Sequence, residues 1–311
     1  MSLKILFSAR PGLWDDYEAP FRAALDEAGI VAELGPGVGP PETVDYIVYA
    51  PNPDLRDFAP YTRLKAVLSL WAGVETIAGN ETLTAPLTRM ADPGLKEGMT
   101  EWVMGHVLHH HLNIGHALAR QSGTWEPYVP PLARERRVAV LGLGELGGAV
   151  ARALAALGFD VSGWSRRPRE IEGVRCVSGP DGLTEALAGA HFVICLLPGT
   201  PKTESIVDTA ALGSTAPGAV LINPGRGTLI DDDAVIEALD AGQLGHAVLD
   251  VFRTEPLPET HPFWAHTGIT VTPHVASETR PTTAARFIAE NIRRSEDGKA
   301  LLALVDRASG Y

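Results

Sequence analysis

Three short stretches in the second half of the chain carry side chains suited to anion binding and proton transfer. They are NPGRG (223–227), DVFRTEPLP (250–258) and TPHVAS (272–277), and each follows an apolar run that predicts a buried strand. Loops after the carboxyl ends of parallel strands meet at one edge of a sheet. We therefore expect one arginine, one glutamate and one histidine to share a site: Arg226, Glu255 and His274.

These three residue types fit the reduction of a 2-oxo acid. The Arg226 guanidinium offers a fork of donors that can hold a carboxylate and polarise the neighbouring carbonyl. An imidazole such as that of His274 is suited to deliver a proton near neutral pH. Glu255, if it is hydrogen-bonded to that imidazole, would orient it and stabilise its charge. The spacing predicts a catalytic trio.

A glycine motif upstream predicts a dinucleotide site. In VAVLGLGELGGAV, an apolar strand ends at Leu141 and an Ala-rich helix is expected from Gly147. Such a turn brings a pyrophosphate to the positive end of the helix. We expect the Glu145 side chain to point outward. The predicted pyrophosphate-binding residues are Gly142, Gly144, Glu145, Leu146 and Gly147.

The loop after the next strand indicates which dinucleotide is bound. An acidic residue that binds the adenosine ribose is expected about 20 residues after the glycines. Here SGWSRRPRE places Ser165, Arg166 and Arg167 at that point, and no acid occurs before Glu170. A hydroxyl and two guanidiniums would bind a 2′-phosphate that a carboxylate would repel. This favours NADP, with NAD bound at lower preference; the alternative is a solvated basic loop.

Composition limits the class of protein. The chain has 311 residues, which favours two domains. A net charge of −12 argues against a nucleic-acid surface. The two cysteines, Cys176 and Cys195, cannot form a disulfide framework, and no segment is expected to span a membrane. We expect a cytoplasmic protein that binds neither nucleic acid nor membrane.

Strands alternate with helices in two α/β units. Apolar runs at 3–9, 45–50 and 64–70 predict strands of a small first unit, and 15–28 predicts a helix. A long helix is expected over 97–121. A second unit with a parallel sheet follows, and a last helix is expected over roughly 279–297.

A histidine run, HVLHHHLNIGH (106–116), raises the alternative of a metal site. His106 and His110 are four residues apart and share a helix face, as metal ligands can. No carboxylate or cysteine stands at ligand spacing beside them, and the chemistry inferred above needs no metal. We therefore expect a packed or inter-subunit helix and no functional metal.

The motifs together resemble one family. GLGELG, NPGRG, LDVFRTEPLP and TPHVAS are similar, in order and spacing, to those of the D-2-hydroxyacid dehydrogenases. LWAGVETI, GWSRR and the closing VDRASGY resemble its glyoxylate/hydroxypyruvate reductase A branch, whose members favour NADPH. The resemblance implies an α/β fold with a doubly wound, parallel-sheet (Rossmann) cofactor domain inserted into a smaller flavodoxin-like α/β substrate domain, and an active site in the cleft between them. The expected domains are 97–279 for the cofactor and 1–96 with 280–311 for the substrate.

The resemblance also assigns residues. It places the family's catalytic arginine, glutamate and histidine on Arg226, Glu255 and His274, and a homodimer is implied. The amides of Ala72, Gly73 and Val74 match a loop that binds the substrate carboxylate, together with Arg226. Asp250 matches a residue that contacts the nicotinamide amide. The remaining residues expected to line the cofactor are Leu197, Pro198, Thr203, Pro224, Gly225 and Ala276.

The function expected from these observations is NADPH-dependent reduction of small 2-oxo acids, glyoxylate to glycolate and hydroxypyruvate to D-glycerate. One alternative is an NAD-linked 2-hydroxyacid dehydrogenase of D-lactate or D-glycerate type, which would use the same trio. Another is a dinucleotide sensor on the same scaffold, without turnover.

Overall fold

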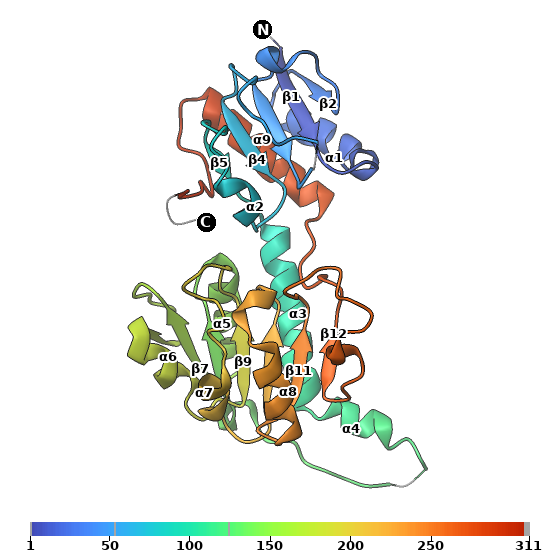
Figure 1. The fold of residues 1–311 in the computed structure, drawn as a ribbon, viewed down its shortest axis with the longest axis vertical. Helices are drawn as coiled ribbons and strands as arrows, with labels where there is room; N and C mark the ends of the chain where they lie inside the picture. The colour runs from blue at the N-terminus through green and yellow to red at the C-terminus, as the bar shows by residue number, and fades with distance from the viewer. Residues whose placement is uncertain (1, 53, 124, 308–311) are drawn as a thin grey trace. The chain divides into compact units, whose positions relative to one another are not determined.

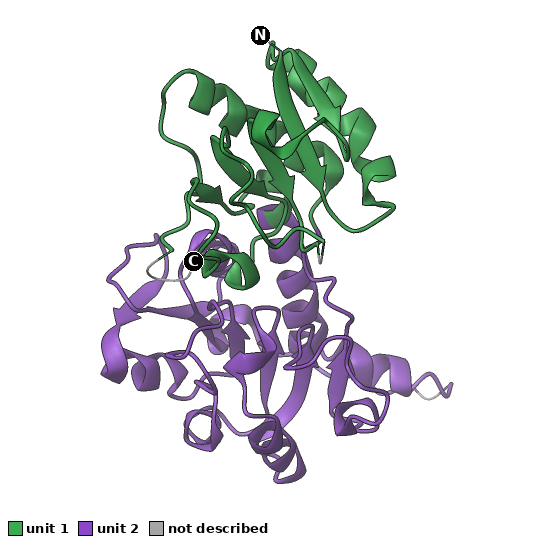
Figure 2. Cartoon of the chain, turned by 45° about the horizontal axis from the view of Figure 1, so that its top comes forward, with its two compact units in different colours: residues 1–95, 279–311 green, residues 96–278 purple. Residues whose placement is uncertain are grey.

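The computed structural model describes residues 2–52, 54–123 and 125–307, so the last four residues of the VDRASGY motif lie outside it. The chain forms two compact units (Figure 2). Unit 1 comprises residues 1–95 and 279–311, and unit 2 comprises residues 96–278. Unit 2 is thus inserted into unit 1.

Unit 1 contains, in its described part, a five-stranded parallel sheet with the order β2-β1-β3-β4-β5. This is the flavodoxin-like order that the resemblance implied. Residues 45–50 and 64–70 were expected as strands, and their centres form β3 and β4, whose residues are all buried. The strands are β1 (Leu3–Ser8), β2 (Ala32–Gly35), β3 (Tyr46–Tyr49), β4 (Ala66–Ser69) and β5 (Leu87–Thr88).

Helices pack on this sheet, and two of them come from opposite ends of the chain. The helices α1 (Leu13–Glu27) and α9 (Pro281–Glu296) pack against each other, and an ion pair of 3.1 Å joins Arg286 to Glu27. The C-terminal tail returns to the sheet, where the Val305 N–H donates to the Leu87 carbonyl over 2.9 Å. The short elements are η1 (Pro41–Thr43) and α2 (Glu75–Ala78).

Unit 2 has, in the described residues, a seven-stranded parallel sheet with the order β12-β11-β10-β9-β6-β7-β8. The chain starts in the middle of the sheet at β6, winds outward to β8, and then returns to build the other half. This is the doubly wound order expected from the sequence. The strands are β6 (Arg137–Leu141), β7 (Asp160–Ser165), β8 (Arg175–Ser178), β9 (Phe192–Cys195), β10 (Ala219–Asn223), β11 (Leu244–Leu249) and β12 (Ile269–Val271).

The sheet of unit 2 is buried on both faces because successive side chains of a strand point to opposite sides. On β6, Val138 and Val140 belong to a core with α3 and α5, whereas Ala139 and Leu141 belong to a core with α6, α7 and α8. Figure 1 shows α7 and α8 in front of this sheet and α3 behind it. The helices are α3 (Pro93–His111), α4 (Ile114–Ala119), α5 (Glu145–Ala156), α6 (Gly179–Leu187), α7 (Thr209–Gly213) and α8 (Asp232–Asp240), with 3-10 turns η2 (Ala133–Glu135), η3 (Gly227–Leu229) and η4 (Pro262–Trp264).

The prediction of a single long helix over 97–121 is wrong at both ends. Helix α3 begins at Pro93, because the Asp92 carboxylate accepts hydrogen bonds from the N–H groups of Gly94 and Leu95. It ends at His111, and Asn113 takes a left-handed conformation with φ 55° before α4 resumes. Asparagine tolerates that conformation better than most residues, so it can break a helix whose composition favours continuation.

No helix within the described ranges is long and apolar enough to cross a membrane.

Candidate active site

The predicted acid–base pair is formed. The Nδ1 atom of His274 lies 2.8 Å from Oε2 of Glu255. The other carboxylate oxygen of Glu255 accepts a hydrogen bond from the Phe252 N–H over 2.9 Å. The side chains are 55% and 36% exposed, so the pair is open to solvent and to a ligand. The glutamate thus fixes one imidazole nitrogen and is itself fixed by the backbone of its own loop.

The backbone at His274 is held in an uncommon conformation. Its φ of 55° lies in the left-handed region, which costs a non-glycine residue free energy and often marks a functional position. Its N–H donates to the carbonyls of Asp250 and Thr272, at 2.9 and 3.0 Å. These bonds turn the histidine out of the line of β12.

Asp250, at the end of β11, organises the loop that carries the histidine. Its side chain is completely buried, and a buried carboxylate requires donors around it. Oδ1 accepts from the Thr272 hydroxyl at 2.6 Å and from the Val275 N–H at 2.9 Å, and Oδ2 accepts from the Ala276 N–H at 2.9 Å. Asp250 therefore binds the histidine loop within this chain, as well as standing where a nicotinamide contact was expected.

Arg226 stands on the loop after the neighbouring strand β10. Asn223 positions this loop, since its Nδ2 donates to the Arg226 carbonyl at 2.9 Å and its Oδ1 accepts from the Gly225 N–H at 3.2 Å. The half-buried Arg226 side chain donates from Nη1 to the Gly225 carbonyl at 2.6 Å. Pro224 and Gly225 are buried, and a Cβ on Gly225 would lie 2.7 Å from the Cys195 carbonyl oxygen.

The three predicted catalytic residues thus follow three neighbouring strands, β10, β11 and β12. Asn223 and Thr272 were not among the predicted site residues, although their side chains hold the loops of Arg226 and His274. Both are polar residues at strand ends inside the motifs quoted for the catalytic trio. Their position beside the trio is the signal that could have identified them.

The glycine turn has the geometry that a dinucleotide requires. A Cβ on Gly147 would lie 1.8 Å from the Gly142 carbonyl oxygen, so only glycine allows this close packing. A Cβ on Gly144, by contrast, would meet no atom within 4 Å, which leaves the backbone open to a ligand. Helix α5 begins at Glu145, two residues before the expected start, and its N-terminus carries Leu146. Because this end of the helix offers N–H groups to an anion, the turn fits a pyrophosphate.

The Glu145 side chain is open to solvent, as expected of an outward-pointing residue. Its side chain is 64% exposed, and its Oε2 lies 3.6 Å from Nζ of Lys96. An exposed pair of this kind contributes little stability, but it orients the carboxylate.

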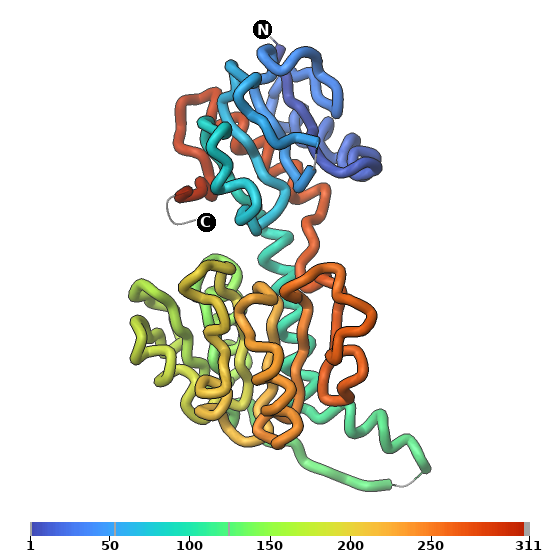
Figure 3. The backbone as a smooth tube through the Cα atoms, in the orientation of Figure 1, coloured from blue at the N-terminus to red at the C-terminus, as the bar shows by residue number. Residues whose placement is uncertain are grey.

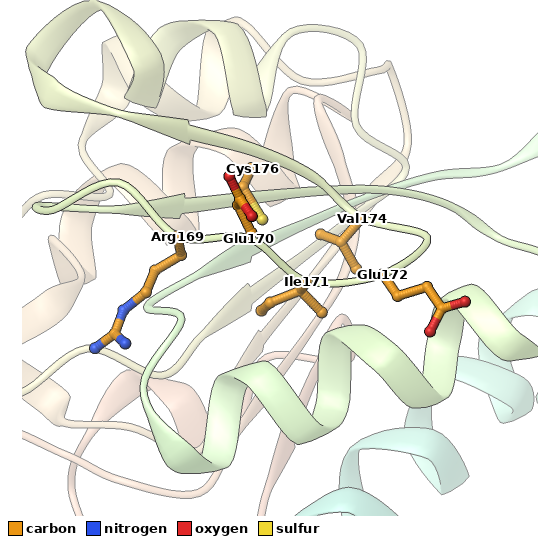
Figure 4. Close-up of a pocket in the computed structure, with 6 residues that line it drawn as sticks. All are labelled: Arg169, Glu170, Ile171, Glu172, Val174 and Cys176. Atoms are coloured by element: carbon orange, nitrogen blue, oxygen red, sulfur yellow. The ribbon is translucent and has the colours of Figure 1, made fainter.

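The loop after β7 presents three exposed arginines, Arg166, Arg167 and Arg169. The Ser165 hydroxyl donates to the Arg167 carbonyl at 2.7 Å. The serine therefore shapes the loop that displays the guanidiniums. Immediately after it lies a hollow of about 460 Å³ (Figure 4), and none of the predicted site residues lines it. Its lining residues are Arg169, Glu170, Ile171, Glu172, Val174 and Cys176.

The stretch after β9 forms a tight turn of its own. The Thr203 hydroxyl donates to the Pro198 carbonyl at 2.7 Å and accepts from the Thr200 N–H at 2.9 Å. Leu197 and Ala276 are buried, and the Ala276 N–H is bound to Asp250. Cys195, in β9 itself, is fully buried, and burial raises the pKa of its thiol to about 12. That thiol is not a nucleophile at neutral pH.

In unit 1, Ala72, Gly73 and Val74 lie between β4 and α2. The Ser69 hydroxyl fixes the start of this segment, accepting from the Trp71 N–H at 3.0 Å. Over the described ranges, the N–H groups of Ala72, Gly73 and Val74 form no hydrogen bond to the protein. They are therefore donors that an anion can use.

The histidines of α3 pack against rings. The His106 ring lies 4.2 Å from that of Trp102, and the His110 ring lies 4.6 Å from that of His246. Burial and neighbouring histidines lower the pKa of His110 to about 4. No group of three or more histidine, cysteine or acidic residues suited to a metal occurs in the described part of the chain.

Comparison with known proteins gives a consistent result. Residues 104–276 match the family model described as the NAD-binding domain of D-isomer specific 2-hydroxyacid dehydrogenases. A glyoxylate/hydroxypyruvate reductase A of Serratia proteamaculans is 41% identical over 257 residues, which is 80% of this chain and 82% of the relative. One from Photorhabdus laumondii is 39% identical over 276 residues, covering 86% and 88%.

Solved structures agree with this result. A D-isomer specific 2-hydroxyacid dehydrogenase of Xanthobacter autotrophicus, in complex with NADPH and MES, has a TM-score of 0.91 at 39% identity, with 100% of both chains covered. An NADPH-dependent glyoxylate/hydroxypyruvate reductase of Sinorhizobium meliloti, in complex with NADP and sulfate, has a TM-score of 0.86 at 34% identity over 100% of both chains. With its two parallel sheets, its glycine turn and these relatives, the chain belongs to the D-isomer specific 2-hydroxyacid dehydrogenase family.

Proposed function

We propose that this protein reduces small 2-oxo acids with NADPH, with glyoxylate and hydroxypyruvate as substrates. The observation that carries the proposal is the His274–Glu255 pair on the strand-end edge that also carries Arg226. Relatives named glyoxylate/hydroxypyruvate reductase A at 36% to 41% identity support this substrate class.

In the proposed reaction, bound NADPH supplies a hydride to the carbonyl carbon of the substrate. Arg226 holds the substrate carboxylate and polarises the carbonyl. Because Glu255 binds Nδ1 of His274, the Nε2 atom is the one that donates a proton to the carbonyl oxygen as it gains charge. Glu255 stabilises the imidazolium before that transfer and keeps the ring oriented.

The cofactor assignment rests on the glycine turn and on the loop after it. The turn at Gly142, Gly144 and Gly147 accommodates a pyrophosphate, and Arg166 with Arg167 supplies the charge for a 2′-phosphate. Relatives of known structure contain NADPH or NADP. Leu197, Pro198, Thr203 and Asp250 are assigned to the remainder of the cofactor site.

Each domain has a proposed role. We assign cofactor binding to residues 97–279, and substrate binding to residues 1–96 with 280–311. The amides of Ala72, Gly73 and Val74 are assigned to the substrate carboxylate, as is the Arg226 guanidinium. The lack of hydrogen bonds from these amides to the described protein supports this role.

We further infer a homodimer and a cytoplasmic location. Both cysteines are free thiols, which suits a reducing compartment, and fractionation of cells would test the location. The dimer is supported by α4 and the chain after it, an arm (residues 112–123 and 125–132) that runs away from the rest of unit 2 (Figure 3). Its exposed apolar side chains include Trp125 and Val129, each 94% exposed, which would be covered by a second copy.

The first test is turnover by the purified protein. NADPH oxidation with glyoxylate and hydroxypyruvate should be faster than with pyruvate, and faster than NADH oxidation. Faster turnover with the NAD couple than with the NADP couple, on D-lactate or D-glycerate or their oxo acids, would support the NAD-linked dehydrogenase instead. Binding of NADPH without turnover of any of these acids would support the sensor.

Removal of the proton donor should affect the chemical step. The variant His274→Ala should lower kcat by about 10²- to 10⁴-fold, because proton transfer by a positioned side chain contributes that much. Glu255→Gln should cause a smaller loss, because an amide keeps a hydrogen bond but not the charge. Glu259→Gln, the same change on an exposed residue of the same loop, is the control. Wild-type turnover by His274→Ala would refute the assignment of the donor.

Removal of Arg166 and Arg167 should weaken the binding of one cofactor, NADPH, and not that of NADH. The double variant Arg166→Ala/Arg167→Ala should raise the KM for NADPH by about tenfold, since charge-assisted bonds at an exposed site are partly screened. The KM for NADH should stay nearly constant. Arg152→Ala, which removes an exposed arginine from α5, controls for the loss of positive charge. Equal increases for both cofactors would show that the loop does not recognise the phosphate.

Substitution within the arm should weaken self-association. Trp125→Ser with Val129→Ser should shift the protein from dimer to monomer at micromolar concentration, as measured by sedimentation velocity. Val31→Ser, which removes an apolar side chain 78% exposed in unit 1, should leave the mass unchanged. A monomeric wild type would contradict the dimer.

A further inference from the structure

Three neighbouring strands of unit 2 end in loops that each carry one assigned residue. Thr203 follows β9, Arg226 follows β10 and Glu255 follows β11. The reaction proposed above needs these loops in a fixed register, since small displacements of reacting groups reduce rate strongly. The backbone of each loop is irregular, so the sheet alone does not set their spacing.

One guanidinium, on the third of these loops, contacts the other two. Arg253 belongs to the loop of Glu255 and donates from Nη1 to Oε1 of Glu204 at 2.5 Å. Its Nη2 donates to the Ser205 hydroxyl at 2.8 Å and to the Ile230 carbonyl at 2.6 Å. Its Nε lies 3.9 Å from the Asp232 carboxylate at the start of α8. The side chain is 34% exposed, and its bond to the Ile230 carbonyl is partly buried.

Backbone contacts also join the three loops. A Cβ on Gly227 would lie 1.9 Å from the carbonyl carbon of Phe252, so the loop of Arg226 packs directly on the residue before Arg253. The Ser205 N–H donates to the Thr228 carbonyl at 2.8 Å, and the Val207 N–H donates to the Leu229 carbonyl at 3.0 Å. The Arg253 side chain adds bonds from the third loop to both of the others, and His261 of the same loop lies 3.7 Å from the Asp232 carboxylate.

The Glu255 carboxylate is hydrogen-bonded to the residue that precedes Arg253. Oε1 of Glu255 accepts from the Phe252 N–H, and Oε2 holds the imidazole of His274. A shift of residues 252–253 therefore moves the carboxylate and, through it, the proton donor. We propose that Arg253 is a positioning residue, which ties the loops of Thr203, Arg226 and Glu255 into the register that the reaction needs. This proposal rests on the proposed function.

An arginine is suited to this task because its planar fork directs donors to several acceptors at once. Lysine keeps the charge but presents one nitrogen on a flexible stem. It can pair with Glu204 or reach the Ile230 carbonyl, but it does not reproduce the whole set of bonds. Arg253→Lys should therefore restore part of what Arg253→Ala loses.

The test compares Arg253→Ala and Arg253→Lys with the wild type and with Arg175→Ala. Arg175 is a matched control on β8, at the other edge of the sheet, since it makes two bonds to Ser162 and an ion pair with Glu185 of α6. For each protein, kcat is expressed per NADPH-binding site, counted by fluorescence titration. Hydrogen–deuterium exchange is measured over residues 203–207, 226–232 and 251–258.

We expect Arg253→Ala to lower kcat per binding site by about 10- to 100-fold and to speed exchange in those three segments only. Arg253→Lys should be intermediate, and Arg175→Ala should match the wild type in both measurements. Unchanged kcat per site, or unchanged exchange in the three segments, would overturn the proposal. A wild type inactive with every oxo acid would refute the proposed function, and exchange alone would then decide the role of Arg253.

Discussion

Burial of one negative charge at the end of β11 organises this site. A carboxylate without solvent must be surrounded by donors, or its burial is too costly. Asp250 meets that requirement with the Thr272 hydroxyl and two backbone N–H groups, so the chain after β12 must return to it. That return forces His274 into the left-handed conformation and aims its ring at Glu255. The free-energy cost of the left-handed backbone at His274 is thus offset by the hydrogen bonds that the same loop donates to Asp250.

The parallel sheet provides the setting in which such loops can meet. Apolar runs alternating with helices predicted both sheets, and the strand orders agree with the two architectures implied by the motifs. The pairing of Glu255 with His274 was also predictable, because both follow adjacent strands of a doubly wound sheet. These features depend on residue type and order, which a sequence displays directly.

Other features depend on contacts that a sequence does not display. The break at Asn113 follows from one residue in a left-handed conformation, although the segment around it has a composition suited to a helix. The early start of α3 depends on Asp92 as a cap, and that of α5 on the turn at Gly144. The joint role of Asn223, Thr272 and Arg253 required knowledge of which loops touch. Strand β5 was missed because two residues carry too little pattern, and β8 was missed because its residues, Arg-Cys-Val-Ser, are half polar and not fully buried.

The insertion of unit 2 into unit 1 has a consequence for biosynthesis. Residues 96–278 are contiguous, so unit 2 has its whole sheet and both helical layers once that stretch has left the ribosome. Unit 1 has its five strands early, but α9, which packs on α1, is made almost 200 residues later. During that interval the apolar face that α9 covers is exposed in the nascent chain. The unit encoded first is therefore completed last, and it needs protection from aggregation while the inserted unit is synthesised.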